Sequence, residues 1–259
     1  MITSLLLTEY YNTGKIDLKS FWLRRFKRLI PAVFFLIMSV LLLTLIFEPS
    51  EIKPIRADAV AAVFYVSNWW YIIQNVDYFE QFAVAPFKHL WSLAIEEQFY
   101  LVFPVVLLGL LTFVRRTKWI RITFYTLLFI SLVTMAVLYV PQENVARVYF
   151  GTDTRLQTLL MGVILAWIWP PFKLSAKINQ TLKSIIDAVG LIGLVILILC
   201  FKNVEEASNW LYYGGFFLIS GVTLFIIASS VHPSGYFAKL LGNRVFTYIG
   251  SCLLYTSPS

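Results

Sequence analysis

The chain has 259 residues, of which 59% are hydrophobic and only 14% are charged. Globular proteins average about 45–50% apolar and about 25% charged residues, so this composition excludes an ordinary soluble domain and indicates a protein of the lipid bilayer. The net charge of +7 comes from short basic runs beside apolar segments, an arrangement that orients membrane spans. No segment is long and polar enough to form a basic face for nucleic acid, so a nucleic-acid partner is not expected.

Six segments predict membrane-spanning helices, because a span needs about 20 mostly apolar residues. In chain order they are Leu29–Phe47, Leu90–Val114, Ile122–Val140, Leu156–Pro170, Ile185–Phe201 and Trp210–Val231. A seventh segment, Ala57–Ile73, is shorter and ends in the aromatic run Asn68-Trp69-Trp70-Tyr71. Such a composition is typical of an interfacial segment.

The distribution of basic residues indicates how Ala57–Ile73 is placed. If this segment does not cross and residues 15–28 are cytoplasmic, fifteen basic residues lie inside and six outside; if it crosses, the numbers become ten and eleven. Because lysine and arginine gather on the cytoplasmic side, the first arrangement is favoured. Phe79–His89 and Pro141–Thr154 then face outward. Ala57–Ile73 is predicted to be a re-entrant or interfacial helix, buried against protein.

The predicted fold is therefore all-α. It is a polytopic transmembrane helical bundle of about six full spans plus one re-entrant or interfacial helix. Residues 1–250 are expected to form one membrane-embedded domain, and residues 251–259 an unusual, non-native tail.

Charged residues inside spans are costly and usually functional. The segment His89–Tyr100 places His89, Glu97 and Tyr100 on one helical stripe, with Glu96 beside it. Counted from His89 at 1.5 Å per residue, the two carboxylates lie about 10–12 Å down the helix. This pattern predicts a polar cavity that opens outward, in which a carboxylate accepts protons or holds a hydroxyl substrate. The alternative is a structural role, with a glutamate bound to an arginine or tyrosine of a neighbouring helix.

Two further motifs carry charge near the spans. Arg24, Arg25 and Arg28 precede the first span, and planar guanidinium groups suit the phosphates of a cytoplasmic nucleotide-bearing cofactor. The same residues would also serve as a topology anchor on anionic lipid. Asp153 and Arg155 lie on an outward loop, where they could pair with each other, contact substrate, or balance Glu96 or Glu97. The sequence has neither a glycine-rich phosphate loop nor metal-ligand spacing, so no metal is expected.

Taken together, these motifs resemble the acyltransferase 3 family of bacterial integral membrane O-acyltransferases. The resemblance rests on Arg-Arg-x-x-Arg-x-x-Pro at 24–31, His-x-Trp-Ser-Leu-x-x-Glu-Glu-Gln-Phe-Tyr at 89–100 and Thr-Asp-Thr-Arg at 152–155, and it extends to about residue 250. It implies a protein of the bacterial cell membrane. Its donor would be acyl-CoA, usually acetyl-CoA, on the cytoplasmic side, and its acceptor a hydroxyl of a carbohydrate or lipid-linked glycan of the cell envelope.

The resemblance also implies roles for individual residues. Arg24 and Arg28, with Arg25 beside them, would engage the phosphates of the donor. The catalytic core would contain His89, Glu97 and Tyr100, and the candidate substrate contacts are Trp91, Glu96, Asp153 and Arg155.

The resemblance further predicts that the chain is a fragment. Family members begin with two further spans, the first of which carries the histidine regarded as the catalytic base, whereas Met1–Leu7 reads as the end of a span. The base is thus expected outside this chain, with Glu97 orienting it or balancing its charge.

Two other classes of function remain open. One is a transporter or flippase for a lipid-linked glycan, with the intramembrane carboxylates coupling proton movement. Transporters often contain internal repeats, and the absence of a repeat here counts against this reading. The other is an inert scaffold of an envelope assembly complex. Consumption of acyl-CoA distinguishes the enzyme from both.

Overall fold

The computed structural model describes residues 2–76, 86–114, 116–141, 143, 145–170, 179–204, 208–232, 235–248 and 250. Every regular element within these ranges is helical, as the sequence predicts. The predicted tail at 251–259 and residues 77–85 of the predicted outward loop lie outside them. The helices belong to two compact units, which are described separately below.

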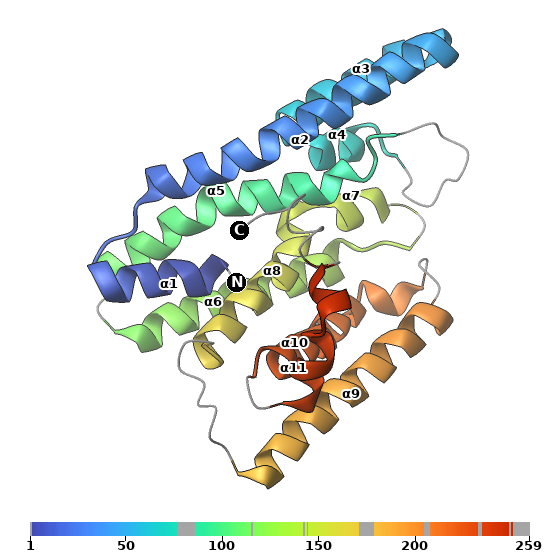
Figure 1. Ribbon diagram of the computed structural model, residues 1–259. Helices are drawn as coiled ribbons and strands as arrows, with labels where there is room; N and C mark the ends of the chain where they lie inside the picture. Colours follow the sequence, from blue (N-terminus) through green and yellow to red (C-terminus); the bar gives the residue numbers. More distant parts are fainter. Residues whose placement is uncertain are drawn as a thin grey trace. The chain divides into compact units, whose positions relative to one another are not determined.

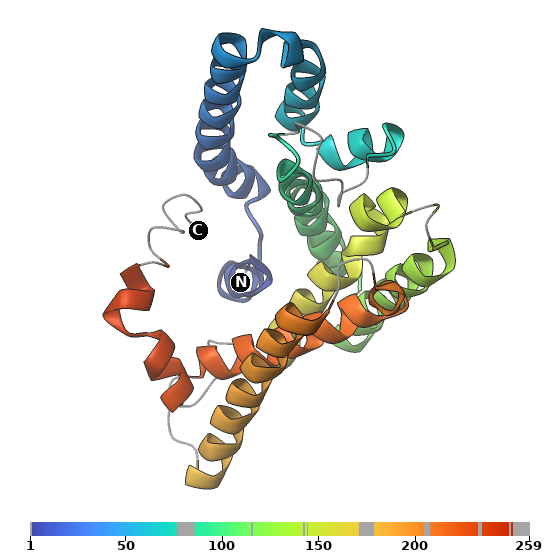
Figure 2. The ribbon, with the colours of Figure 1, turned by 90° about the vertical axis from the view of Figure 1, so that its right-hand side faces the viewer.

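The first unit comprises Asp17–Arg115 and Val137–Leu156. Its elements are α2 (Leu18–Phe47), the 3-10 turn η1 (Pro49–Glu51), α3 (Ile52–Val63), α4 (Ser67–Ile73), α5 (Leu90–Phe113), α7 (Val145–Phe150) and the start of α8 (Thr152–Ile168). Helices α2 and α3 run side by side as an antiparallel hairpin (Figures 1 and 2).

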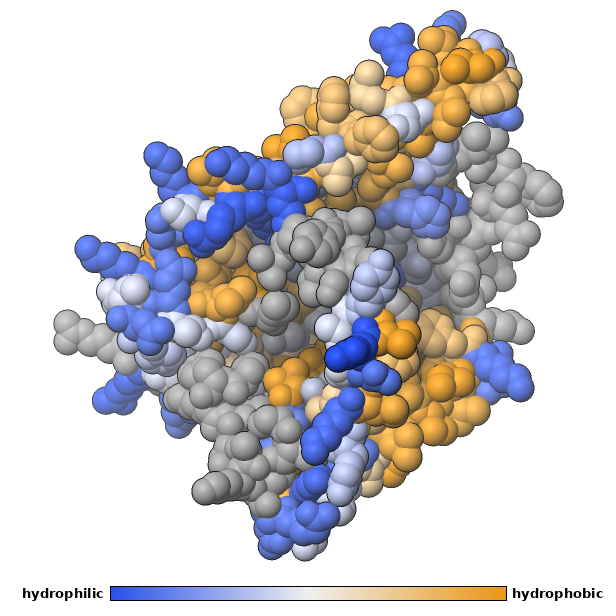
Figure 3. Space-filling model, viewed as in Figure 1, coloured by the Kyte–Doolittle hydropathy of each residue, from blue (hydrophilic) through white to orange (hydrophobic). Residues whose placement is uncertain are grey.

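Helix α2 begins where Asp17 accepts the backbone N–H of Ser20 at 3.0 Å, a bond that satisfies one of the free donors of a first turn. Its 30 residues extend about 45 Å, longer than the bilayer hydrocarbon of about 30 Å. The surplus is the basic first part of the helix. Figure 3 shows hydrophilic side chains gathered there and mostly apolar side chains along the rest of α2, with hydrophilic ones again at the tip of the hairpin.

The segment predicted to be re-entrant or interfacial is a broken helix. Helix α3 ends at Val63 and α4 begins at Ser67, with Tyr65 between them in the left-handed region at φ 54°. Neither piece approaches the length of a span. Both are tied to protein: α3 packs on α2 through Ile55, Ala59 and Ala62, and Asn68 and Tyr71 of α4 are buried.

The second unit comprises Met1–Ile16, Arg116–Ala136 and the described residues after Leu156. Its elements are α1 (Ile2–Thr13), most of α6 (Thr117–Leu138), the rest of α8, α9 (Gln180–Asn203), the 3-10 turn η3 (Asn209–Leu211), α10 (Gly215–Val231) and α11 (Tyr236–Leu241). Helices α9 and α10 lie closely against each other because Gly190 has no side chain: a Cβ there would lie 2.7 Å from the Cβ of Ser229.

Within the described residues, four helices are long and apolar enough to cross a membrane, namely α2, α5, α6 and α9. Each carries one of the predicted spans. The two other predicted spans correspond to α8 and α10, which have 17 residues each, at the lower limit of spanning length. The chain is a helical membrane protein.

Candidate active site

An ion pair joins α2 and α5 in the first unit. Nε of Arg25 donates to both carboxylate oxygens of Glu97, at 2.9 and 3.1 Å, and Nη2 donates to Oε1 at 2.6 Å. The side chains are 15% and 7% exposed, respectively. Such charge-assisted, two-pronged bonds are among the strongest that side chains make. They replace the hydrogen bonds to water that the carboxylate loses when it is buried.

Aromatic side chains hold this pair from both helices. The guanidinium carbon of Arg25 lies 3.5 Å from the centroid of the Tyr100 ring, a cation–π contact. Nε1 of Trp22 donates to the carbonyl oxygen of Tyr100 at 3.1 Å. Trp22 and Arg25 are three residues apart, as are Glu97 and Tyr100. One helical turn of α2 and one of α5 therefore form this part of the site.

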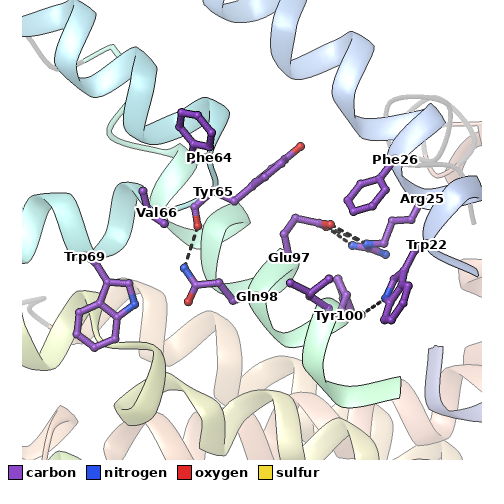
Figure 4. Close-up of a pocket in the computed structure, with 11 residues that line it drawn as sticks. Trp22, Arg25, Phe26, Phe64, Tyr65, Val66, Trp69, Glu97, Gln98 and Tyr100 are labelled. Atoms are coloured by element: carbon purple, nitrogen blue, oxygen red, sulfur yellow. Dashed lines mark hydrogen bonds and ion pairs between the residues drawn. The ribbon is translucent and has the colours of Figure 1, made fainter. Parts of the chain in front are cut away.

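A cavity of about 430 Å³ lies beside the pair (Figure 4). Its lining comes from α2, from the break between α3 and α4, from α4 and from α5. It comprises Trp22, Arg25, Phe26, Phe64, Tyr65, Val66, Trp69, Glu97, Gln98, Tyr100 and Leu101. Most of these side chains are aromatic or aliphatic. A mainly apolar pocket of this size with a few convergent polar groups is the usual form of a small-molecule site.

Three polar side chains close a hydrogen-bonded ring behind the cavity wall. Gln98 Nε2 donates to Asn68 Oδ1 at 2.9 Å, Asn68 Nδ2 donates to Thr152 Oγ1 at 2.9 Å, and Thr152 Oγ1 donates to Gln98 Oε1 at 2.6 Å. The ring links α4, α5 and the beginning of α8. It therefore brings together the three parts of the sequence that contain Asn68-Trp69, Glu96-Glu97-Gln98 and Thr152-Asp153.

The loop motif around Asp153 forms a second charged cluster in this unit. Asp153 accepts from both Nη atoms of Arg147, at 2.9 and 2.6 Å, and the Arg147 guanidinium lies 5.4 Å from the Trp69 ring. Arg155 donates from Nε to the carbonyl oxygen of Tyr149 at 2.8 Å. Its guanidinium lies over the rings of Tyr149 and Trp91, at 4.4 and 5.4 Å.

Some of the predicted site residues meet at the cavity, some meet at the second charged cluster, and the others lie outside both. Glu97, Tyr100 and Arg25 meet at the cavity, whereas Trp91 and Arg155 meet at the second cluster, with Asp153 paired to Arg147. His89 and Glu96 are exposed and do not belong to the described lining of the cavity. Arg24 is exposed on α2, and Arg28 is partly buried, within electrostatic range of Glu97 and Tyr100.

The pairing with Arg25 changes the expected depth of Glu97. Arg25 precedes the end of α2 at Phe47 by 22 residues, which is about 33 Å along a helix. Glu97 therefore lies level with the basic first part of α2, the part assigned to the cytoplasmic side. The depth of about 10–12 Å expected from the sequence takes His89 as the outer surface. The pairing with Arg25 does not support a cavity near that surface.

Sequence reasoning missed several residues that build the site. Asn68 and Gln98 carried a signal, because an amide inside an apolar segment is costly to bury without partners. Arg147 is a basic residue on a loop predicted to face outward, where basic residues are unusual. Nothing in the local sequence marks Trp22 or Tyr65, whose positions depend on contacts between helices distant in sequence.

Comparison with known proteins agrees with these motifs. The acyltransferase domain model of the family matches residues 1–255. The O-acetyltransferase OatA of Staphylococcus aureus strain NCTC 8325 is 55% identical over 250 residues, which cover 96% of this chain and 41% of the relative. The protein of the same name from strain COL matches to the same extent. The chain thus spans about two fifths of the length of these curated relatives, and no solved structure matches it. The chain belongs to the acyltransferase 3 family.

Proposed function

We propose that the protein is a membrane-bound O-acyltransferase of the bacterial cell membrane. It would transfer an acyl group, in the first instance acetyl, from acyl-CoA to a hydroxyl of a cell-envelope carbohydrate or lipid-linked glycan. Family membership and the name of the OatA relatives support acyl transfer and the acetyl group. The observation that carries the proposal is the buried Arg25–Glu97 pair at the wall of an aromatic cavity.

The reaction would be general-base acyl transfer. A base removes the proton of the acceptor hydroxyl while its oxygen attacks the thioester carbonyl carbon. The C–S bond then breaks, and CoA leaves as a thiolate that takes up the proton. Both oxygens of Glu97 already accept bonds from Arg25, so Glu97 is suited to orientation and charge balance rather than to proton removal.

Arg25 would supply the electrostatic part of the catalysis. Its guanidinium binds Glu97 through Nε and Nη2 and belongs to the cavity wall, from which an N–H of the guanidinium would donate to the thioester oxygen. A fixed donor aimed at an oxygen that gains negative charge lowers the barrier most where water is excluded. The phosphates of the donor would lie beyond the cavity, at the exposed Arg24 and the partly buried Arg28.

The acceptor would bind at the second charged cluster. The rings of Trp91 and Tyr149, with the Arg155 guanidinium over them, and the Arg147–Asp153 pair combine aromatic surface with hydrogen-bonding groups, the two kinds of contact that a sugar makes. This cluster contains the predicted substrate contacts Trp91, Asp153 and Arg155. Glu96, which is exposed, would contribute to substrate binding only indirectly.

Turnover by the purified full-length protein in lipid vesicles tests the proposal. With acetyl-CoA and envelope glycan present, the wild type should release CoA thiol and acetylate the glycan. Glu97→Gln should slow turnover at least about tenfold, the effect of losing one strong polar interaction in the transition state. Glu96→Gln is the comparison variant, because it removes the neighbouring carboxylate and leaves the hydrogen bonds between Arg25 and Glu97 in place.

Three outcomes contradict parts of this account. If the wild type consumes no acetyl-CoA, the transferase proposal fails, and movement of a lipid-linked glycan between leaflets becomes the assay to perform. Turnover of Glu97→Gln equal to that of the wild type removes the role of Glu97 alone. If Glu96→Gln is the slower variant, the assignment of the two carboxylates is reversed.

A further inference from the structure

The ring of Asn68, Gln98 and Thr152 uses its hydrogen-bonding groups fully. Beyond the ring itself, Gln98 Nε2 donates its second proton to the carbonyl oxygen of Tyr65 at 2.8 Å, and Asn68 Nδ2 donates its second proton to the carbonyl oxygen of Phe150 at 3.1 Å. Both side-chain amides thus have both N–H donors and their oxygen engaged. Asn68 is fully buried. A buried polar network satisfied in this way fixes a single arrangement of the segments that it joins.

The bond to Tyr65 reaches the one residue at the break between α3 and α4 whose backbone is unusual. Its φ of 54° is in the left-handed region, which is uncommon for a residue with a bulky side chain and persists only where the surroundings determine it. Two backbone bonds to α3 hold the break: the N–H of Tyr65 donates to Ala62 O at 3.1 Å, and the N–H of Val66 donates to Ala61 O at 2.9 Å. The side chain of Gln98, on α5, binds the carbonyl oxygen of Tyr65.

This backbone conformation directs the Tyr65 side chain into the cavity. Figure 4 shows the ring of Tyr65 extending away from its own carbonyl oxygen, toward the part of the cavity where Glu97 and Phe26 lie. Within the described part of the chain, the phenolic hydroxyl of Tyr65 makes no hydrogen bond. Burial and the nearby carboxylate of Glu97 raise the pKa of Tyr65, so the phenol remains a proton donor at neutral pH.

We propose that Tyr65 contacts the acyl donor, and that the Asn68–Gln98–Thr152 ring positions it to do so. The phenolic hydroxyl would donate a hydrogen bond to a carbonyl oxygen of acyl-CoA bound in the cavity, across from Arg25. This inference rests on the acyl transfer proposed above. It assigns the ring the part of a positioning network and Tyr65 that of a donor-binding residue.

Steady-state kinetics of the full-length protein with acetyl-CoA test both parts. Tyr65→Phe removes only the hydroxyl and should raise the KM for acetyl-CoA about tenfold, the effect of one hydrogen bond lost to a ligand. Its unfolding temperature should remain that of the wild type, because the hydroxyl makes no bond within the described protein. Thr152→Val opens the ring at nearly constant volume and should raise the same KM, whereas Thr152→Ser retains the hydroxyl and should behave as the wild type.

The double variant Tyr65→Phe/Thr152→Val separates positioning from simple stability. If the ring acts through Tyr65, the double variant should have a KM no higher than the worse single variant, because both changes remove one interaction. Independent, multiplying effects on KM would overturn the positioning role.

Two results would overturn the inference in distinguishable ways. If the wild type turns over acetyl-CoA and Tyr65→Phe has a KM within twofold of it, Tyr65 does not contact the donor although the proposed function stands. If the wild type does not turn over acetyl-CoA, the proposed function and this inference fail together. Should Thr152→Val not fold, the comparison of Tyr65→Phe with the wild type still decides whether Tyr65 contacts the donor, and Thr152→Ala replaces Thr152→Val in the test of positioning.

Discussion

Glu97 and Arg25 illustrate what it takes to keep charge inside a membrane domain. A buried carboxylate is tolerated only when strong bonds replace its water, and here three N–H···O contacts from one guanidinium do so. Tyr100 covers the guanidinium and keeps it in place. Removing one partner would leave the other as an uncompensated buried charge.

Variants of the pair should therefore be strongly non-additive. Arg25→Met should lower the free energy of unfolding by about 3 kcal/mol or more, because Glu97 is left unpaired. Arg25→Met/Glu97→Leu, which replaces both charges by apolar side chains, should recover most of that loss. Denaturant unfolding of the full-length protein in detergent measures both. A double variant as unstable as the sum of the single variants would show that the pair is not coupled.

Asp58 predicts a pH dependence elsewhere in the same unit. Its carboxylate accepts from Trp70 Nε1 at 2.9 Å and from the Tyr71 hydroxyl at 3.4 Å, yet burial raises the pKa of Asp58 above its ordinary 3.8. A group that binds its proton more tightly when folded stabilises the fold at low pH. That contribution is lost as pH rises from about 3.8 through the raised value.

Asp58→Asn should remove this dependence. The amide oxygen can still accept the bond from Trp70, and no charge has to be buried, so the variant should be at least as stable as the wild type at pH 7. Its free energy of unfolding should also change less between pH 4 and pH 7. A variant less stable than the wild type at pH 7 would show that the ionised carboxylate stabilises the junction of α3 and α4.

At the scale of helices, hydropathy predicted where the spans lie, and the distribution of basic residues predicted which segment does not cross. Each predicted span has a helix over most of its length, and the segment Ala57–Ile73, predicted not to cross from the distribution of basic residues over the loops, is broken between α3 and α4. The position of the break could not be predicted. The left-handed backbone of Tyr65 depends on Gln98, 33 residues away in sequence. The partner of Glu97 could not be predicted for a related reason, since it depends on which turn of α2 faces α5.

Replacement by alanine should change the stability differently at two glycines, because only Gly190 lies where α9 and α10 pack closely. Gly190→Ala should destabilise the protein by about 1–3 kcal/mol, because the new Cβ would meet the Cβ of Ser229 at 2.7 Å and the helices must move apart. Gly162→Ala in α8 meets no atom within 4 Å and should be neutral or stabilising, since alanine favours a helix more than glycine does. Equal unfolding free energies for the two variants would contradict the close contact.

For the molecule as a whole, composition was enough to predict a helical membrane protein, and the motifs were enough to predict its family. Partner choice was not predictable: Asp153 forms an ion pair with Arg147, and Glu97 forms one with Arg25, whose neighbour Arg24 is exposed. Adjacent arginines on a helix point in directions about 100° apart. Only the packing of α2 on α5 decides which of them enters the site.

The topology can be checked by labelling single cysteines in the full-length protein after Cys200 and Cys252 are replaced by serine. With Ala57–Ile73 not crossing, cysteines at Lys53 and Lys88 should react with an impermeant maleimide added outside intact cells. A cysteine at Lys118 should react only after permeabilisation. Labelling of positions 53 and 88 from opposite sides would mean that the broken helix crosses the membrane.

Binding of radiolabelled acetyl-CoA to the purified full-length protein tests the central claim most directly. The account predicts that the wild type binds and that Arg24→Ala/Arg28→Ala loses most of this binding, since the two cations proposed to hold the donor phosphates are removed. Arg24→Lys/Arg28→Lys keeps the charge and should retain part of it. An intact protein that binds no acetyl-CoA, or a double alanine variant that binds it as the wild type does, would contradict an acyl-CoA site at the basic end of α2.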